Sequence, residues 1–137
     1  MPRRNSLQSK IESRIAERRD DVFLTREFAD LGGERQVLRA LSNVVKAGGL
    51  VRLGYGVYGR AFASRLSGKP LLYNRGGFIG AARDALTKLG VVWEPSDAEQ
   101  AYNEGRSTQI PVNPRLKVRG RFSRKLRDGT QELVVER

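Results

Sequence analysis

The stretch from residue 25 to residue 60 constrains the fold most, because its glycines and capping residues divide it into short elements. Thr25 is suited to cap a first helix, which the glycine pair at 32–33 would end. A second glycine pair, at 48–49, permits the left-handed backbone that often follows a helix. Hydrophobic spacing then predicts the elements in order: a helix ending before residue 32, a helix over residues 34–47, and strands over residues 50–53 and 57–58. This order is typical of a winged helix-turn-helix, in which the two strands form the wing.

The second of these helices has two distinct faces when its residues are placed about 100° apart. One face is apolar and predicts a core stripe of Val37, Leu38, Leu41, Val44 and Val45. The opposite face gathers basic and polar side chains: Arg35, Arg39, Ser42 and Lys46, with Gln36 and Asn43 beside them. These side-chain types contact phosphates and base edges in the major groove of DNA. An ordinary solvated helix face is the alternative, but the glycine turn before the helix and the basic wing after it favour DNA binding.

The wing carries two arginines and an aromatic residue of its own. Arg52, Tyr55 and Arg60 are predicted to contact DNA, since a basic hairpin tip can lie along the backbone or enter a minor groove. The alternative is a tight turn whose tyrosines pack on the core. We expect Tyr58 to belong to the core and Tyr55 to be exposed.

The residues before this stretch predict a further helix and a short strand. Ser6 is suited to cap a helix that carries Leu7, Ile11 and Ile15 on one face. Residues 22–24 form an apolar run that could pair with the wing as a strand. Residues 61–70 are small, polar and interrupted by glycine and proline, so we interpret them as a linker. The predicted domains are therefore residues 1–64, a winged helix-turn-helix, and residues 65–137, a small C-terminal domain.

The C-terminal domain is expected to mix helices and strands. A helix is predicted over residues 78–89, with Ile79, Ala82, Leu86 and Leu89 facing inward. The remaining predicted elements are a short strand or turn over residues 71–73, a buried strand over 91–93, a helix over 97–103 capped by Ser96, and strands over 108–112, 116–122 and 132–135. Asp128 and Gly129 predict a hairpin turn between the last two strands. The whole chain is thus assigned to the α+β class, with a basic β-hairpin near its end.

The segment from residue 115 to residue 127 is strongly basic and contains no acidic residue. Its basic residues are Arg115, Lys117, Arg119, Arg121, Arg124, Lys125 and Arg127. The first four alternate, so in a strand they would share one face. A charged edge strand protected against aggregation is the alternative interpretation. We favour contact with a polyanion and include residues 115, 117, 119, 121, 124 and 125 in the predicted DNA-binding surface.

Composition excludes several classes of function. The 137 residues include 26 Lys and Arg against 15 Asp and Glu, a net charge of +11 that favours a nucleic-acid partner. Without cysteine or histidine, the chain lacks disulfides, thiolate chemistry and the commonest general base, so we expect no catalytic site, no metal and no cofactor. No apolar run approaches the roughly 18 residues that span a bilayer, so we expect a cytoplasmic protein without a membrane partner.

A family resemblance follows from the same residues. Residues 22–60, VFLTREFADLGGERQVLRALSNVVKAGGLVRLGYGVYGR, resemble the N-terminal winged helix of abortive-infection type IV antitoxins, the AbiEi-like family. The matching phrases lie at residues 22–28, 39–52 and 56–58, and the C-terminal half is similar through STQIP at residues 107–111 and the closing basic hairpin. The resemblance implies an antitoxin-like repressor of its own operon that binds repeated sites on double-stranded DNA. It also implies a toxin that is opposed without direct binding. Longer members of the family carry a larger C-terminal domain associated with antitoxicity, so the resemblance implies DNA binding more than toxin neutralisation.

Three classes of function remain open on the sequence. The first is a DNA-binding repressor with an antitoxin role, and the second is a phage- or plasmid-borne interaction protein or inhibitor that uses the same fold to bind protein. An RNA- or nucleotide-processing enzyme is the third. The exposed face of the second helix is basic and polar, whereas a protein-binding face should carry apolar anchors, so the first class is favoured.

Overall fold

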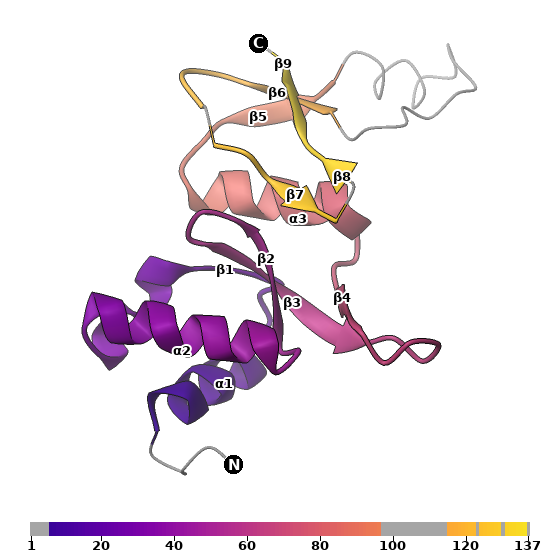
Figure 1. Ribbon diagram of the computed structural model, residues 1–137. Coiled ribbons are helices and arrows are strands. Elements are labelled where there is room, and N and C mark those ends of the chain that lie inside the picture. Colours follow the sequence, from indigo (N-terminus) through magenta and orange to yellow (C-terminus); the bar gives the residue numbers. More distant parts are fainter. Residues whose placement is uncertain (1–5, 97–114, 123, 130, 137) are drawn as a thin grey trace.

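The computed structural model describes residues 6–96, 115–122, 124–129 and 131–136, and within them the fold is a mixed α+β arrangement (Figure 1). The helices are α1 (Leu7–Glu17), the 3₁₀ helix η1 (Thr25–Leu31), α2 (Glu34–Lys46) and α3 (Gly77–Lys88). The strands are β1 (Val22–Leu24), β2 (Leu50–Gly54), β3 (Val57–Ala63), β4 (Pro70–Leu72), β5 (Trp93–Pro95), β6 (Arg115–Val118), β7 (Arg127–Asp128), β8 (Gln131–Glu132) and β9 (Val134–Glu136). The predicted α+β class is therefore confirmed at this level. No helix in the ranges given above is long and apolar enough to cross a membrane.

Helices α1 and α2 form where the sequence predicts them. The Ser6 hydroxyl accepts a hydrogen bond from the main-chain N–H of Ser9 at 3.1 Å and so caps α1. Ile11 and Ile15 are buried on the inner side of that helix. Helix α2 ends one residue earlier than predicted, and its C-terminal glycine, Gly48, has a φ of 88°, the left-handed region that glycine adopts without strain.

The first predicted helix differs in type and in its cap. Residues 25–31 form a 3₁₀ helix rather than an α-helix, and the cap residue is Leu24 instead of Thr25. The Glu27 carboxylate accepts a hydrogen bond from the Leu24 N–H at 2.7 Å. The Glu27 side chain therefore provides a hydrogen-bond partner for a main-chain N–H at the start of the helix. The Thr25 hydroxyl is buried and has no hydrogen-bond partner within the described ranges. The prediction that Thr25 caps this helix is therefore wrong.

The first sheet joins three parts of the sequence. Its strand order is β1-β3-β2, with antiparallel pairing throughout, so residues 22–24 do pair with the β2–β3 hairpin. The predicted linker is wrong, because residues 61–63 continue β3 and pair with β4, Phe62 opposite Leu71. Gly68 supplies the turn with a φ of 71°. The boundary predicted between residues 64 and 65 thus falls within a β-hairpin.

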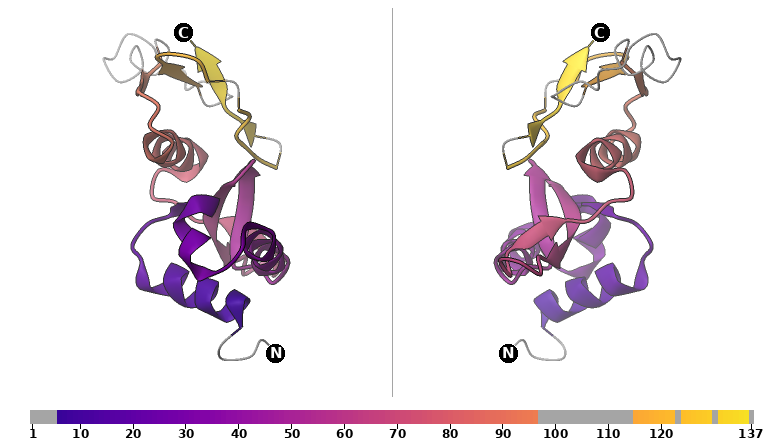
Figure 2. Two further views of the ribbon diagram at one scale, coloured as in Figure 1. Left: turned by 90° about the vertical axis from the view of Figure 1, so that its left-hand side faces the viewer. Right: turned by 90° about the vertical axis from the view of Figure 1, so that its right-hand side faces the viewer.

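Two hydrophobic clusters cover opposite faces of this sheet. On one face, Phe23, Leu50 and Tyr58 pack against the buried sides of α1, η1 and α2. On the other face, Val22, Leu24, Leu53 and Val57 pack with α3 and the C-terminal strands, and the members from those elements include Phe78, Leu86, Leu116 and Leu126. Alternate residues of each strand point to opposite faces, so one three-residue strand, β1, contributes to both clusters. Figure 2 shows the helices α1 and α2 on one side of the sheet and α3 on the other.

The C-terminal part agrees with the prediction for α3 and departs from it afterwards. Residues 91–93 were expected as a buried strand, but β5 begins at Trp93 and Val92 is 61% exposed. Strand β6 ends at Val118, and Gly120 turns the chain with a φ of 85°. The predicted basic hairpin is wrong, because β6 pairs antiparallel with β5 and parallel with β9. The turn at Asp128 and Gly129 is confirmed, although it joins the two-residue strands β7 and β8. The predicted elements over 97–103 and 108–112 lie outside the described residues.

Candidate nucleic-acid interface

Helix α2 presents its predicted polar face to solvent. Val37, Leu41 and Val44 are buried against α1 and the sheet, and this stripe fixes the rotation of the helix. The predicted contact residues on the opposite side are all exposed: Arg35, Gln36, Arg39, Ser42, Asn43 and Lys46. Leu38 departs from the prediction, because it lies at the margin of the apolar stripe with 39% of its surface exposed. The exposed face of α2 is therefore polar and basic, with Leu38 at its edge.

The cations on this face have no partner in the part of the chain that the structure describes. Arg35, Arg39 and Lys46 form no ion pair or hydrogen bond with another described residue. Elsewhere on the N-terminal part, basic residues are neutralised: the Arg14 guanidinium lies 2.6 Å from the Asp30 carboxylate, which lowers the pKa of that carboxyl to about 2. The exposed cations of α2 thus differ from Arg14, whose charge is neutralised by a neighbouring carboxylate.

The β2–β3 hairpin places two more of the predicted residues beside α2. Tyr55 lies between Gly54 and Gly56 at the tip and is 74% exposed, whereas Tyr58 is buried in the core, so both expectations about these tyrosines are confirmed. Arg52 is exposed, and its side chain donates a long hydrogen bond of 3.5 Å to the Gly54 carbonyl. The tip therefore exposes one arginine and one aromatic ring.

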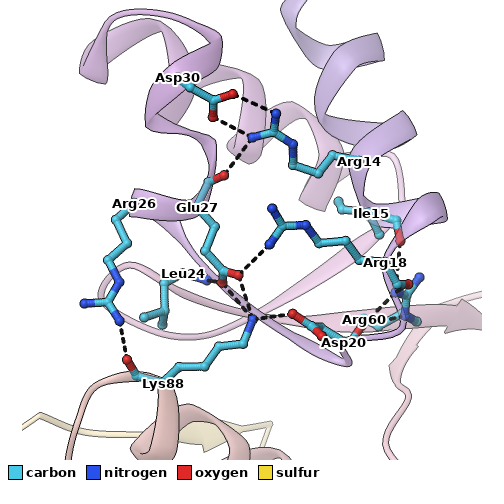
Figure 3. A network of polar contacts seen from close by, with 10 residues as sticks. All are labelled: Arg14, Ile15, Arg18, Asp20, Leu24, Arg26, Glu27, Asp30, Arg60 and Lys88. Carbon is cyan, nitrogen blue, oxygen red and sulfur yellow. Dashed lines mark hydrogen bonds and ion pairs between the residues drawn. The ribbon is translucent and has the colours of Figure 1, made fainter.

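Arg60 lies apart from this surface, because its side chain forms contacts within the protein, and its predicted contact with DNA stays a prediction. It lies in the middle of β3, and Figure 3 shows its guanidinium directed toward the end of α1. The group donates hydrogen bonds to three main-chain carbonyls, those of Ile15 at 2.9 Å, Arg18 at 2.8 Å and Asp20 at 2.7 Å. A helix end leaves carbonyls without partners and favours a cation, so α1 takes this arginine as its cap. Nothing in the sequence links residue 60 to α1.

The structure brings part of the basic C-terminal segment to the hairpin tip. The Arg124 guanidinium lies 3.5 Å from the Tyr55 carbonyl oxygen. Gly54 faces the main chain of Lys125 so closely that a Cβ there would lie 2.5 Å from the Lys125 carbonyl oxygen. Arg124 and Lys125 are both exposed, so they add positive charge beside Arg52. This contact joins two residues that are 69 positions apart in the sequence.

A small pocket of about 240 Å³ lies where these elements meet. Its lining includes three arginines, Arg26, Arg52 and Arg124, together with Leu38, Tyr55 and one acidic residue, Glu34. Arg26 could not be predicted from the sequence, because a lone arginine in a short helix carries no periodic signal. Its guanidinium also donates a hydrogen bond to the main-chain carbonyl of Lys88 in α3 (Figure 3). The pocket thus extends the basic surface from α2 across the hairpin tip.

The remaining predicted residues of the basic segment lie elsewhere. Figures 1 and 2 place β6 at the opposite end of the molecule from α2. Arg115 forms an ion pair of 3.5 Å with Glu136 on the neighbouring strand, and Lys117 is only partly exposed and has a partner. Arg119 and Arg121 are exposed, but β6 ends before them, so the predicted four-residue row along one strand face is wrong. These four residues are not part of the surface around α2.

An ion network attaches α3 to the N-terminal elements and so fixes the geometry of this surface. The Lys88 ammonium lies 2.8 Å from the Asp20 carboxylate and 2.7 Å from that of Glu27 (Figure 3). The hydrogen bond from Lys88 lowers the pKa of Asp20. Glu27 also pairs with Arg18 at 3.0 Å. Glu27 on η1 therefore links α1, through Arg18, to α3, through Lys88.

Within the described ranges, no group of three or more His, Cys, Asp or Glu side chains could hold a metal ion. Comparisons with protein-family models, with curated proteins and with solved structures each find no match.

Proposed function

We propose that this protein binds double-stranded DNA through a winged helix-turn-helix and regulates transcription. In this proposal α2 is the recognition helix and the β2–β3 hairpin is the wing. The observation that carries it is the exposed face of α2, where arginine, lysine and amide side chains stand together without a partner among the described residues. A protein that bound nothing anionic would gain no stability from leaving these cations grouped and unpaired.

The arrangement supports a division of labour between base and backbone contacts. Arg35, Arg39 and Asn43 stand on a helix face of the width that enters a major groove, and their side chains can bond to guanine or adenine edges. Arg52, Tyr55 and Arg124 lie beside α2 at the hairpin tip, where an adjacent stretch of phosphates would pass. The net charge of +11 would accelerate the encounter with DNA and make the affinity depend on salt.

The biological role proposed is that of an autorepressor in an antitoxin-like system. A protein bound over its own promoter excludes polymerase, so occupancy alone represses the operon. The resemblance of residues 22–60 to abortive-infection antitoxins supports this role. The competing proposal, an inhibitor that binds protein through the same helix, is less favoured because Leu38 is the sole large apolar side chain exposed on α2.

Binding can be tested by fluorescence anisotropy with duplexes from the protein's own upstream region, at about 150 mM salt. A base-shuffled duplex of equal length serves as the reference. We expect an upstream duplex to bind at least about a thousandfold more tightly than the shuffled one. Arg19→Ala, which removes an exposed cation outside α2 and the hairpin, is the matched control and should leave the ratio unchanged. Equal affinity for all duplexes, or no binding, would contradict the proposal.

A further inference from the structure

A pocket of about 850 Å³ lies between the N-terminal elements and α3. Its lining comes from residues 18–22 at the junction of α1 and β1, from β3, from the segment that follows β4, and from α3. Small-molecule sites in proteins commonly have volumes of about 300–1,000 Å³. Among the described residues, none lines both this pocket and the one at the β2–β3 hairpin tip. The pocket is therefore separate from the candidate nucleic-acid interface.

Charged side chains make up most of the lining. Five of them are basic: Arg18, Arg19, Arg60, Arg75 and Lys88. Three are acidic: Asp20, Asp21 and Asp84. The excess of cations favours an anionic ligand.

The cations of the pocket fall into two groups. Three have carboxylate partners within the protein: Arg18 with Glu27 at 3.0 Å, Arg60 with Asp21 at 3.5 Å, and Lys88 with Asp20 at 2.8 Å (Figure 3). Arg19 and Arg75 are exposed, and neither forms an ion pair or hydrogen bond with another residue in the part of the chain that the structure describes. A guanidinium can donate two parallel hydrogen bonds to phosphate oxygens. The two arginines therefore provide a binding site for phosphate groups.

Tyr73 and Asp84 add two further binding groups to the same lining. Tyr73 is 46% exposed, and an aromatic ring of this kind can stack on a nucleobase. Asp84 is also exposed, and its Oδ2 atom accepts a hydrogen bond from the Asn74 amide at 3.0 Å. The other carboxylate oxygen, Oδ1, has no hydrogen-bond partner among the described residues. A carboxylate repels phosphate but accepts hydrogen bonds from ribose hydroxyls.

We propose that this pocket binds a ribonucleotide. Arg19 and Arg75 bind its phosphate groups. Asp84 accepts a hydrogen bond from a ribose hydroxyl, and Tyr73 contacts the base. Inorganic phosphate would use the two arginines alone, so the lining fits a complete nucleotide better. This binding does not depend on the proposed contact with DNA, because the two sites share no described residue.

Isothermal titration calorimetry of the full chain with the four ribonucleoside triphosphates and with inorganic triphosphate tests the proposal. We expect one nucleotide per chain, and at least about tenfold tighter binding of the preferred nucleotide than of inorganic triphosphate. Attraction to the net charge of +11 alone gives no such preference, because inorganic triphosphate is at least as highly charged. Equal affinity for nucleotide and inorganic triphosphate, or no binding of any nucleotide, would overturn the proposal.

Two double variants separate the pocket from the overall charge. Arg19→Ala/Arg75→Ala should raise the dissociation constant of the preferred nucleotide at least about tenfold, because both phosphate-binding groups are lost. Arg119→Ala/Arg121→Ala removes two exposed cations outside the pocket and is the matched control, which should change that constant less than about twofold. Both variants should keep the thermal stability of the wild type, because all four side chains are exposed. Equal weakening by the two double variants would overturn the proposal.

The single variant Asp84→Ala tests the ribose contact. It should raise the dissociation constant of the preferred nucleotide at least about threefold, because a charged hydrogen-bond acceptor is lost. Inorganic triphosphate should bind this variant at least as tightly as the wild type, because a carboxylate that repels it has been removed. Nucleotide affinity equal to that of the wild type would contradict the assignment of a ribonucleotide to this pocket.

Discussion

Replacing Arg60 with alanine should destabilise the fold, whereas replacing Arg52 on the neighbouring strand should not. Both residues were predicted to belong to a basic wing, but Arg52 makes one hydrogen bond of 3.5 Å among the described residues, whereas Arg60 makes several shorter ones. Its side chain is 23% exposed, donates hydrogen bonds to the carbonyls of Ile15 and Arg18 at the end of α1 and of Asp20 just beyond it, and lies 5.4 Å from the centre of the Phe23 ring. Alanine would leave those carbonyls without their donor.

The expected loss can be assembled from its parts. A hydrogen bond to a charged group contributes about 1.5–3 kcal/mol to stability, and a cation at a helix C-terminus about 0.3–1 kcal/mol. The position over the Phe23 ring adds roughly 0.5–1 kcal/mol. These contributions share one group and water would replace part of the bonding, so they do not add fully. We expect Arg60→Ala to lower the free energy of unfolding by about 2–4 kcal/mol.

Urea denaturation followed by far-UV circular dichroism measures this loss directly. Arg52→Ala is the matched control and should stay within about 0.5 kcal/mol of the wild type. Arg60→Lys should fall between the two, because an ammonium cannot span three carbonyls as a guanidinium does. If Arg60→Ala kept wild-type stability and lost affinity for DNA, the assignment of this residue to the α1 cap would be refuted.

Three further predictions concern the interface and the ion pairs. Arg39→Ala should weaken specific DNA binding by about 1–3 kcal/mol and relax one operator position, as measured by anisotropy on single-base variants of the duplex. Arg124→Gln should reduce the slope of log affinity against log salt by roughly 0.9 while preserving sequence preference, which a salt titration measures. The hydrogen bond from Arg14 lowers the pKa of Asp30 from 3.8 to about 2. The ionised Asp30 carboxylate therefore stabilises the fold above pH 3.8, and this stabilisation is lost as the pH falls toward 2. In urea titrations at a series of pH values, Asp30→Asn should therefore reduce the fall in the free energy of unfolding between pH 3.8 and pH 2.

Each of these has a result that would count against it. If a folded Arg39→Ala protein kept both its affinity for the duplex and its sequence preference, Arg39 on α2 would not contact the bases. If the salt slope of Arg124→Gln matched that of the wild type, the C-terminal segment would lie off the DNA. If the free energy of unfolding fell equally with pH in Asp30→Asn and in the wild type, the ion pair with Arg14 would not form in solution.

The N-terminal elements could be predicted from sequence because local signals agree there. The helical spacing of Ile11 and Ile15 in α1, and of Val37, Leu41 and Val44 in α2, identifies a buried face without knowledge of what packs against it. The predicted linker failed because small and polar residues at 61–70 describe a turn as well as a connection. Only the pairing of Phe62 with Leu71, a tertiary feature, distinguishes a hairpin from a linker.

The part of the candidate site on α2 could be predicted from the sequence. The parts that depend on contacts between residues far apart in the sequence could not. A helix face is a local property, so Arg35 and Arg39 could be assigned from periodicity alone. The role of Arg60 depends on where α1 ends in space, and the approach of Arg124 to Tyr55 depends on how the C-terminal chain packs on the hairpin. An arginine can contact DNA, cap a helix or form an ion pair, so the sequence alone could not show which of these roles each arginine has.

Amide chemical shifts of the ¹⁵N-labelled protein, recorded during titration with an upstream duplex, test the central claim most directly. The proposed interface predicts that the largest changes cluster on α2, at residues 52–56 of the β2–β3 hairpin and at residues 124–125. Amides of β6 and of the β3–β4 hairpin should change little. Shifts centred on β6 or on the β3–β4 hairpin, with α2 unaffected, would contradict the assignment of α2 as the recognition helix.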